Sequence, residues 1–170
     1  MLGGVCLFLT LTVLQALVAG ANDLIAPLHL SLFAGGLYVG TAAFMLPFRA
    51  GFFALFAAGL ACDANSGAPF GTHAFLFTTA HVFLYHFRDR LPHEETVGRV
   101  FIVLLCNLAL FAALTLVSLR SPSLLSRAGY RFASDLVISQ LVIAVIAPWF
   151  FSFQRQSLAL VGAIRERRIA

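Results

Sequence analysis

The sequence predicts an all-α integral membrane protein with about six transmembrane helices. Of its 170 residues, 61% are hydrophobic and only 11% are charged, and the mean hydropathy is +0.95. Soluble domains carry about 25% charged residues, and a small domain keeps much of its surface exposed to water. The apolar residues also gather into six runs with no linker between them. We therefore expect one polytopic membrane domain, residues 1–170.

The lengths of the six runs indicate how each one meets the bilayer. A spanning helix needs about 20 residues, and four of the runs satisfy this. The third and fourth are shorter, and we expect them to be tilted into the protein or re-entrant. In chain order the predicted helices are 2–19, 28–47, 50–62, 73–87, 98–119 and 136–153, followed by a basic cytoplasmic tail, 154–170.

Local signals refine the ends of these helices. The first run has no basic residue before it and is long enough to span, so we interpret it as an uncleaved helix and not a signal peptide. Pro47 and Gly51 mark a sharp start for the third helix. Ser134 and Asp135 are typical of a helix N-terminus and are expected to open the sixth helix.

All eleven basic residues are arginine, and they lie at the ends of the runs. This scatter indicates topology determinants and excludes a nucleic-acid-binding patch. With six crossings, three arginines fall on one side, namely Arg120, Arg127 and Arg131. The other eight are Arg49, Arg88, Arg90, Arg99, Arg155, Arg165, Arg167 and Arg168. The positive-inside rule then places both termini in the cytoplasm. The stretch from Phe153 to Arg168 fits either an amphipathic helix on the inner leaflet or a frayed basic tail.

Two segments resemble catalytic motifs of membrane proteases, and neither is complete. Ser66 lies in a segment that resembles the serine motif of rhomboid proteases, but no histidine follows His93 to act as a base. Glu94 and Glu95 resemble a CAAX-protease motif, yet their charged neighbours indicate a solvated loop. The histidines of the fourth helix lack metal-ligand spacing, and the three cysteines form no CxxC pair. We expect no catalytic, metal or cofactor residue.

The polar stretch between the third and fourth helices is the most unusual feature of the chain. Asp63 ends the third helix, where the helix dipole disfavours a carboxylate. It needs a partner, and the candidates are backbone N–H groups of the turn 65–72, the start of the fourth helix, or His73. Glycine and proline residues between the helices predict a sharp turn and a close helix approach.

This stretch resembles the signature of the rod shape-determining protein MreD family. The resemblance rests on an aspartate that ends a short helix, a Gly-x-Pro-x-Gly turn and a new helix. Chain length, helix number and the basic C-terminus agree with it. The structural motif comprises Gly59, Asp63, Gly67, Pro69, Gly71, His73 and Ala74.

The resemblance implies a fold similar to the S component of energy-coupling-factor transporters and a role without catalysis. The protein would be an inner-membrane scaffold of the bacterial elongation machinery, acting in rod shape maintenance and peptidoglycan synthesis. Its partners would be an MreC-like protein and, indirectly, MreB, RodA and a class B penicillin-binding transpeptidase. The alternative is a vitamin-binding subunit of the S-component type, which would converge several polar side chains around a pocket near the outer face.

Overall fold

The computed structural model describes residues 2–66, 69–90, 95–118 and 122–162, with the backbone alone for 118 and 122–130. Six α-helices account for nearly all of the described chain, and no strand occurs within it. They are α1 (Leu2–Ile25), α2 (Gly35–Met45), α3 (Phe48–Ala64), α4 (Thr72–Phe87), α5 (Thr96–Ser118) and α6 (Pro122–Leu160), with short 3-10 turns η1 (Ala26–Leu28) and η2 (Arg88–Arg90). The all-α class predicted from composition is confirmed.

Three helical stretches are long and apolar enough to cross a membrane. They are Leu2–Leu28, Thr96–Val117 and Arg131–Leu160. The described helices α2, α3 and α4 have 11, 17 and 16 residues, which is shorter than the about 20 residues of a typical spanning helix. The prediction that the third and fourth runs are short therefore agrees with the observed helices, and α2 is shorter still.

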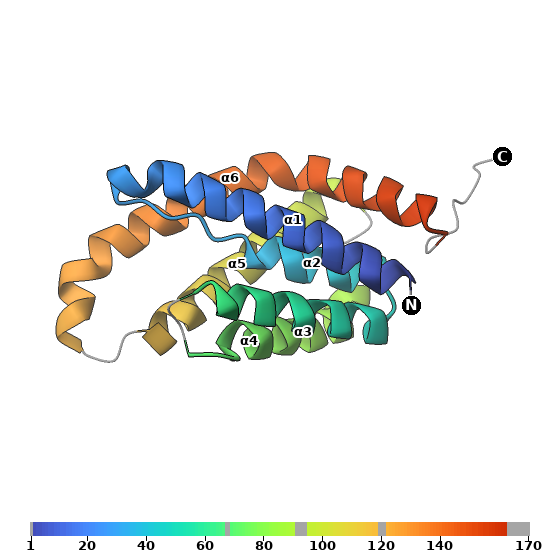
Figure 1. Ribbon diagram of the computed structural model, residues 1–170, viewed down its shortest axis with the longest axis horizontal. Coiled ribbons are helices and arrows are strands. Elements are labelled where there is room, and N and C mark those ends of the chain that lie inside the picture. The colour runs from blue at the N-terminus through green and yellow to red at the C-terminus, as the bar shows by residue number, and fades with distance from the viewer. Residues whose placement is uncertain (1, 67–68, 91–94, 119–121, 163–170) are drawn as a thin grey trace.

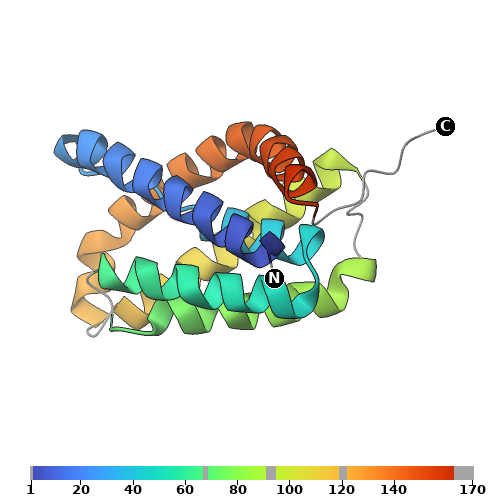
Figure 2. The ribbon, with the colours of Figure 1, turned by 45° about the vertical axis from the view of Figure 1, so that its right-hand side comes forward.

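Helix α2 occupies the centre of the bundle, between the α1/α6 side and the α3/α4 pair (Figures 1 and 2). Every residue from Gly35 to Ala43 is buried. Small residues permit this position: a Cβ atom added to Gly36 would lie 2.5 Å from the Val103 carbonyl oxygen and from the Asn107 backbone nitrogen of α5. Helices can approach so closely only where one of them lacks a side chain.

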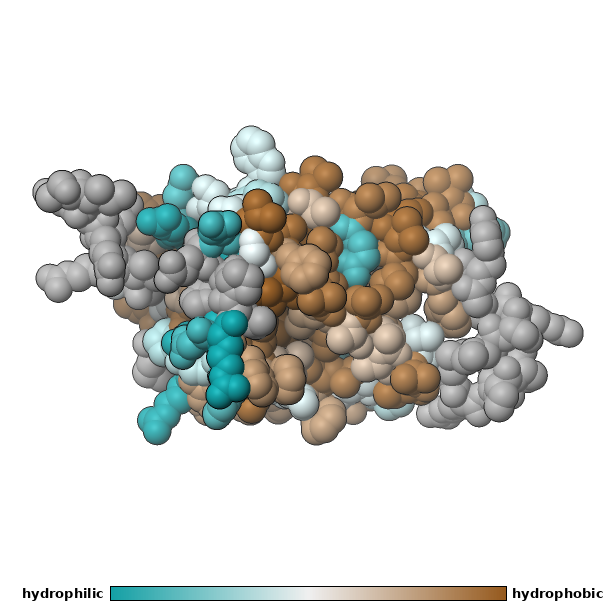
Figure 3. All heavy atoms as spheres, turned by 180° about the vertical axis from the view of Figure 1, so that it is seen from behind, coloured by the Kyte–Doolittle hydropathy of each residue, from teal (hydrophilic) through white to brown (hydrophobic). Residues whose placement is uncertain are grey.

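The outer faces of the bundle are apolar, as a lipid-facing surface requires. Large hydrophobic side chains such as Val13, Leu105 and Trp149 are exposed on α1, α5 and α6. Figure 3 shows hydrophobic residues over the middle of one face, with hydrophilic residues gathered mainly toward one end. The start of α1 and the end of α6 lie at the same end of the bundle (Figure 1).

Four predicted helix boundaries are wrong. Helix α1 ends at Ile25 and not at residue 19. Helix α2 begins at Gly35, because residues 30–34 have no helical hydrogen bonds and follow His29 in the left-handed region (φ 56°). Helix α6 has 39 residues and begins at Pro122, so Ser134 and Asp135 lie inside it. The same helix extends to Leu160 and buries Leu158 in the core, so the first part of the predicted basic tail belongs to the bundle. Residues 163–170 lie outside the described chain.

Candidate functional site

The carboxylate of Asp63 joins the end of α3 to the start of α4. Its Oδ2 atom accepts hydrogen bonds from the backbone N–H groups of Gly71 (3.0 Å) and Ala74 (3.2 Å). Its Oδ1 atom accepts from the backbone N–H of His73 (2.9 Å) and from the His73 ring Nδ1 (2.8 Å). The side chain is fully buried. These are the groups that the sequence analysis named as candidate partners.

This arrangement is an N-cap supplied by a neighbouring helix. The first N–H groups of any helix lack intrahelical partners, and a side chain of the residue before the helix usually accepts from them. Here that position is Gly71, which has no side chain to do so. Asp63 takes its place, and its negative charge lies at the positive end of the α4 dipole. The unfavourable interaction of the carboxylate with the α3 dipole is thereby offset by its favourable interaction with the α4 dipole.

The glycines of the motif meet two different requirements. Gly71 has φ +94°, a conformation that residues with a side chain rarely adopt. Gly59 sits where α3 crosses α4, since an added Cβ would lie 2.4 Å from the Ala74 Cα atom. Pro69 accepts hydrogen bonds from Thr72 through its carbonyl group, which closes the turn. Gly67 lies outside the described residues.

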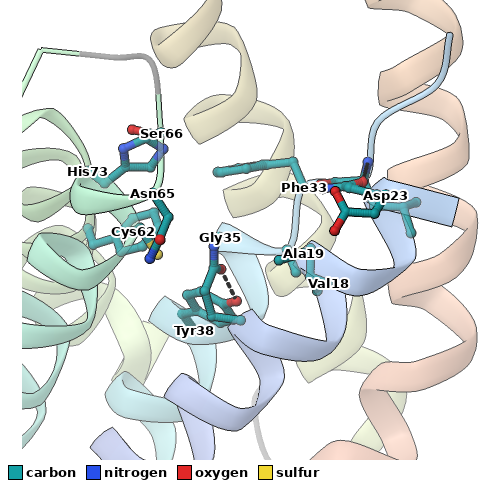
Figure 4. A pocket seen from close by; sticks show the side chains of 15 residues that line it. Val18, Ala19, Asp23, Phe33, Gly35, Tyr38, Cys62, Asn65, Ser66 and His73 are labelled. Atoms are coloured by element: carbon teal, nitrogen blue, oxygen red, sulfur yellow. Dashed lines mark hydrogen bonds between the residues drawn. The ribbon is translucent and has the colours of Figure 1, made fainter. Parts of the chain in front are cut away.

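A cavity of about 300 Å³ lies beside this turn, between α1 and the α3/α4 pair. Cys62, Asn65, Ser66 and His73 form one wall, and Val18, Ala19 and Asp23 of α1 lie across from them (Figure 4). The Tyr38 hydroxyl donates to Gln15 Oε1 (2.7 Å) between these walls. Asp63 is absent from the lining, because its oxygens are turned toward α4.

A second polar cluster, which sequence reasoning missed, holds the extended segment 30–34 between α1 and α2. Asn22 of α1 pairs with both backbone groups of Leu32, accepting from its N–H (2.6 Å) and donating to its carbonyl (3.1 Å). Ser139 of α6 accepts from the N–H of Phe33 (3.0 Å). Side chains from distant helices thus satisfy backbone groups that a helix would have satisfied internally.

Asp135 is part of this cluster, which corrects the role predicted for it. It is buried inside α6 and accepts from both the backbone N–H (2.9 Å) and the hydroxyl (2.8 Å) of Ser31. Asn107 of α5 accepts from the N–H of Gly36 at the start of α2. The signal available in the sequence was the presence of polar residues in otherwise apolar helices, which marks internal contacts in membrane proteins.

Two histidines of α4 join this helix to α3 at its two ends. The His81 ring is buried, stacks on Phe48 and has its Nε2 atom 3.3 Å from the Phe48 carbonyl oxygen, which joins α4 to the start of α3. His73 is committed to Asp63 at the other end of α4. Over the described ranges no group of three or more His, Cys, Asp or Glu side chains could hold a metal ion.

The buried polar side chains of this bundle mostly bind its own backbone, and long apolar helices surround them. This combination defines an α-helical membrane protein. Residues 1–157 of the chain match the model of the family described as rod shape-determining protein MreD. The chain therefore belongs to the MreD family, and its role lies in rod shape determination. No curated protein and no solved structure matches it, so the similarity to S components stays a prediction.

Proposed function

We propose that this protein is a non-enzymatic scaffold of the cell-elongation machinery in the bacterial inner membrane. The observation that carries the proposal is the state of Asp63, the acidic residue of the signature. All four described hydrogen bonds of its carboxylate come from the start of α4 and the residue before it, and its side chain is fully buried. A carboxylate so committed stabilises an interhelical joint and has no free position for a substrate.

The arginine distribution supports a multi-pass topology with both termini in the cytoplasm. Arg49, Arg88 and Arg155 belong to the set of eight that the positive-inside rule assigns to the cytoplasm. The start of α1 and the end of α6 share one end of the bundle (Figure 1). In this orientation the Asp63 joint and the neighbouring cavity face the outer side.

The outward face of α3 and α4 is the surface that we assign to an MreC-like partner. Phe53, Phe75 and Phe83 are 68%, 68% and 67% exposed there. Aromatic side chains offer a large contact area at a low cost in conformational entropy. Through this partner the protein would act with MreB, RodA and a class B penicillin-binding transpeptidase in peptidoglycan synthesis.

The test is complementation of a rod-shaped host that lacks its own MreD, combined with co-purification of an MreC-like protein. Phe75→Ala and Phe83→Ala should lower the recovered partner and produce rounded cells. Phe101→Ala is the matched control, because Phe101 is equally exposed (60%) on α5. Normal cell shape and full partner recovery with both α4 variants would overturn the assignment of this face. Failure of the wild-type chain to recover any such partner would overturn the scaffold role itself.

One observation favours the vitamin-binding alternative: polar side chains do converge on a cavity at the end of the bundle that is assigned to the outer side. A thermal-shift screen of water-soluble vitamins against the purified chain tests it. A rise in melting temperature that Asn65→Leu removes would support a vitamin site. No shift with any vitamin would leave the scaffold as the function.

A further inference from the structure

A second cavity lies next to the one beside the Asp63 joint. It has a volume of about 420 Å³ and lies between α1 and α3. Five residues line both volumes, namely Gln15, Ala19, Tyr38, Cys62 and Asn65. The two volumes are therefore adjacent, and the hydrogen-bonded side chains of Tyr38 and Gln15 lie in the wall that they share. Each volume falls in the range of about 300–1,000 Å³ that is usual for ligand pockets, and we call the two together the cleft.

The two parts of the cleft differ in chemistry. The first part, which we call the polar chamber, contains side-chain groups of Gln15, Asn65, Ser66 and His73. The second part, which we call the alanine groove, runs between Ala16 and Ala19 of α1 and Ala58 and Ala61 of α3. Ala16 lies on the exposed surface of α1, so the groove opens toward the lipid.

Several polar atoms of the chamber have hydrogen-bonding capacity left for a ligand. Asn65 donates to the Ala61 carbonyl through Nδ2, which leaves its Oδ1 atom as an acceptor. His73 uses Nδ1 for Asp63 and keeps Nε2. Gln15 accepts from Tyr38 through Oε1 and keeps its amide donor. A bound headgroup would therefore meet both donors and acceptors.

The charge of the chamber disfavours an anionic headgroup. Neither arginine nor lysine lies among the described residues of its lining, whereas Asp23 stands exposed at its rim. Within the described chain the Asp23 carboxylate has no ion pair. A phosphate close to this carboxylate would experience repulsion in a medium of low dielectric constant, whereas a hydroxyl or amine would not.

We propose that this cleft binds a lipid amphiphile, with an uncharged or cationic hydrogen-bonding headgroup in the polar chamber and a hydrocarbon chain in the alanine groove. The position of the alanine groove, next to the polar chamber and open toward the lipid, favours this occupant over a compact water-soluble molecule, because such a molecule would leave the groove empty. The site is separate from the outward face of α3 and α4 that we assign to a protein partner.

The test uses the full chain in phosphatidylcholine nanodiscs and two photoactivatable lipids with identical acyl chains. One is a diacylglycerol, which carries a free hydroxyl, and the other is the anionic phosphatidylglycerol. Mass spectrometry then locates the crosslinks. We expect the diacylglycerol probe to label residues 12–19 or 58–65 and to be displaced by unlabelled diacylglycerol. The phosphatidylglycerol probe should label exposed helix faces without saturation.

Two variants with the same change of side chain complete the test. Ala16→Phe fills the groove and should lower specific labelling about ten-fold. Ala109→Phe, at an exposed alanine of α5, should leave the labelling unchanged, and size-exclusion profiles establish that both variants fold. Undiminished labelling of Ala16→Phe would overturn the proposal. So would saturable labelling of the same residues by phosphatidylglycerol, or displacement of the diacylglycerol probe by a water-soluble vitamin.

Discussion

Asp135 and Ser31 are 104 positions apart in the chain, yet the Asp135 carboxylate accepts both the backbone N–H and the hydroxyl of Ser31, at 2.9 and 2.8 Å. The contact fixes the extended segment before α2 against the middle of α6. An extended backbone at membrane depth is tolerated only where the protein itself satisfies its polar groups. The pair therefore helps to hold α2 in the centre of the bundle, because it satisfies polar groups of the segment that leads into this helix.

Replacing Asp135 by alanine should destabilise the protein by about 2–3 kcal/mol, because two donors of Ser31 lose a charged acceptor in a buried site. Asp135→Asn should cost less, since one oxygen remains. Thermal unfolding in detergent, followed by circular dichroism, measures the difference. The control is Asp89→Ala, whose side chain is 83% exposed and, among the described residues, pairs with Arg88; it should change little. Equal melting temperatures for Asp135→Ala and Asp89→Ala would contradict the prediction.

Asp63→Ala should be more damaging than His73→Ala. The first variant removes the acceptor from three backbone N–H groups and one ring nitrogen, whereas the second removes the ring contact alone. We expect losses of about 2–3 and about 1 kcal/mol, respectively. Protease sensitivity of the 65–72 turn and the melting temperature report both effects. Asn65→Ala is the control, because Asn65 is exposed and its described side-chain hydrogen bond goes to Ala61 of its own helix. If Asp63→Ala accumulates and melts as the wild type does, the structural role of Asp63 is wrong.

Gly36→Ala and Gly20→Ala make the same change in two helices, and we expect opposite results. At Gly36 the new methyl group meets backbone atoms of α5 at 2.5 Å, so α2 and α5 must separate. At Gly20 nothing lies within 4 Å, and alanine is favoured over glycine in a helix by about 1 kcal/mol. Melting temperatures should fall for the first variant and stay or rise for the second. A stable Gly36→Ala variant would show that the α2–α5 contact is looser than described.

Gly71→Ala tests whether the backbone conformation at this position requires glycine, independently of side-chain packing. Beyond its chain neighbours, no atom of the described residues lies within 4 Å of an added Cβ, yet the φ of +94° is unfavourable for alanine by about 1–2 kcal/mol. Gly71→Asn should be milder, because asparagine tolerates left-handed conformations better. The order glycine, asparagine, alanine in melting temperature is the expected outcome. A Gly71→Ala variant as stable as Gly71→Asn would exclude backbone strain as the reason for this glycine.

The sequence predicted correctly those features that depend on residues close together in the chain. The short apolar runs around Asp63 gave α3 and α4 to within two residues at each end. The dipole of α3 disfavours the Asp63 carboxylate at the end of this helix, which predicted a compensating partner among the nearest donors. The carboxylate does bind these donors. Gly71, in turn, is the residue type that a positive φ requires.

The same signals failed where the partners are distant. Apolar residues continue from Leu28 through Leu46, so hydropathy could not separate the extended segment 30–34 from α2. Ser134 and Asp135 resemble a helix N-terminus, yet the helix passes through them because Ser31 supplies the donors that a free N-terminus would have supplied. A hydropathy profile shows how apolar a segment is. It does not show which distant segment of the chain will form hydrogen bonds with it.

The sequence by itself determined the membrane class, the all-α fold, the family and the turn between α3 and α4, because composition, helix length and glycine–proline spacing are properties of neighbouring residues. Only the tertiary structure decided the central place of α2, the clamp on segment 30–34 and the cleft between α1 and α3. Each of these depends on hydrogen bonds and close contacts between residues far apart in the chain. Such contacts exist only once the helices have packed.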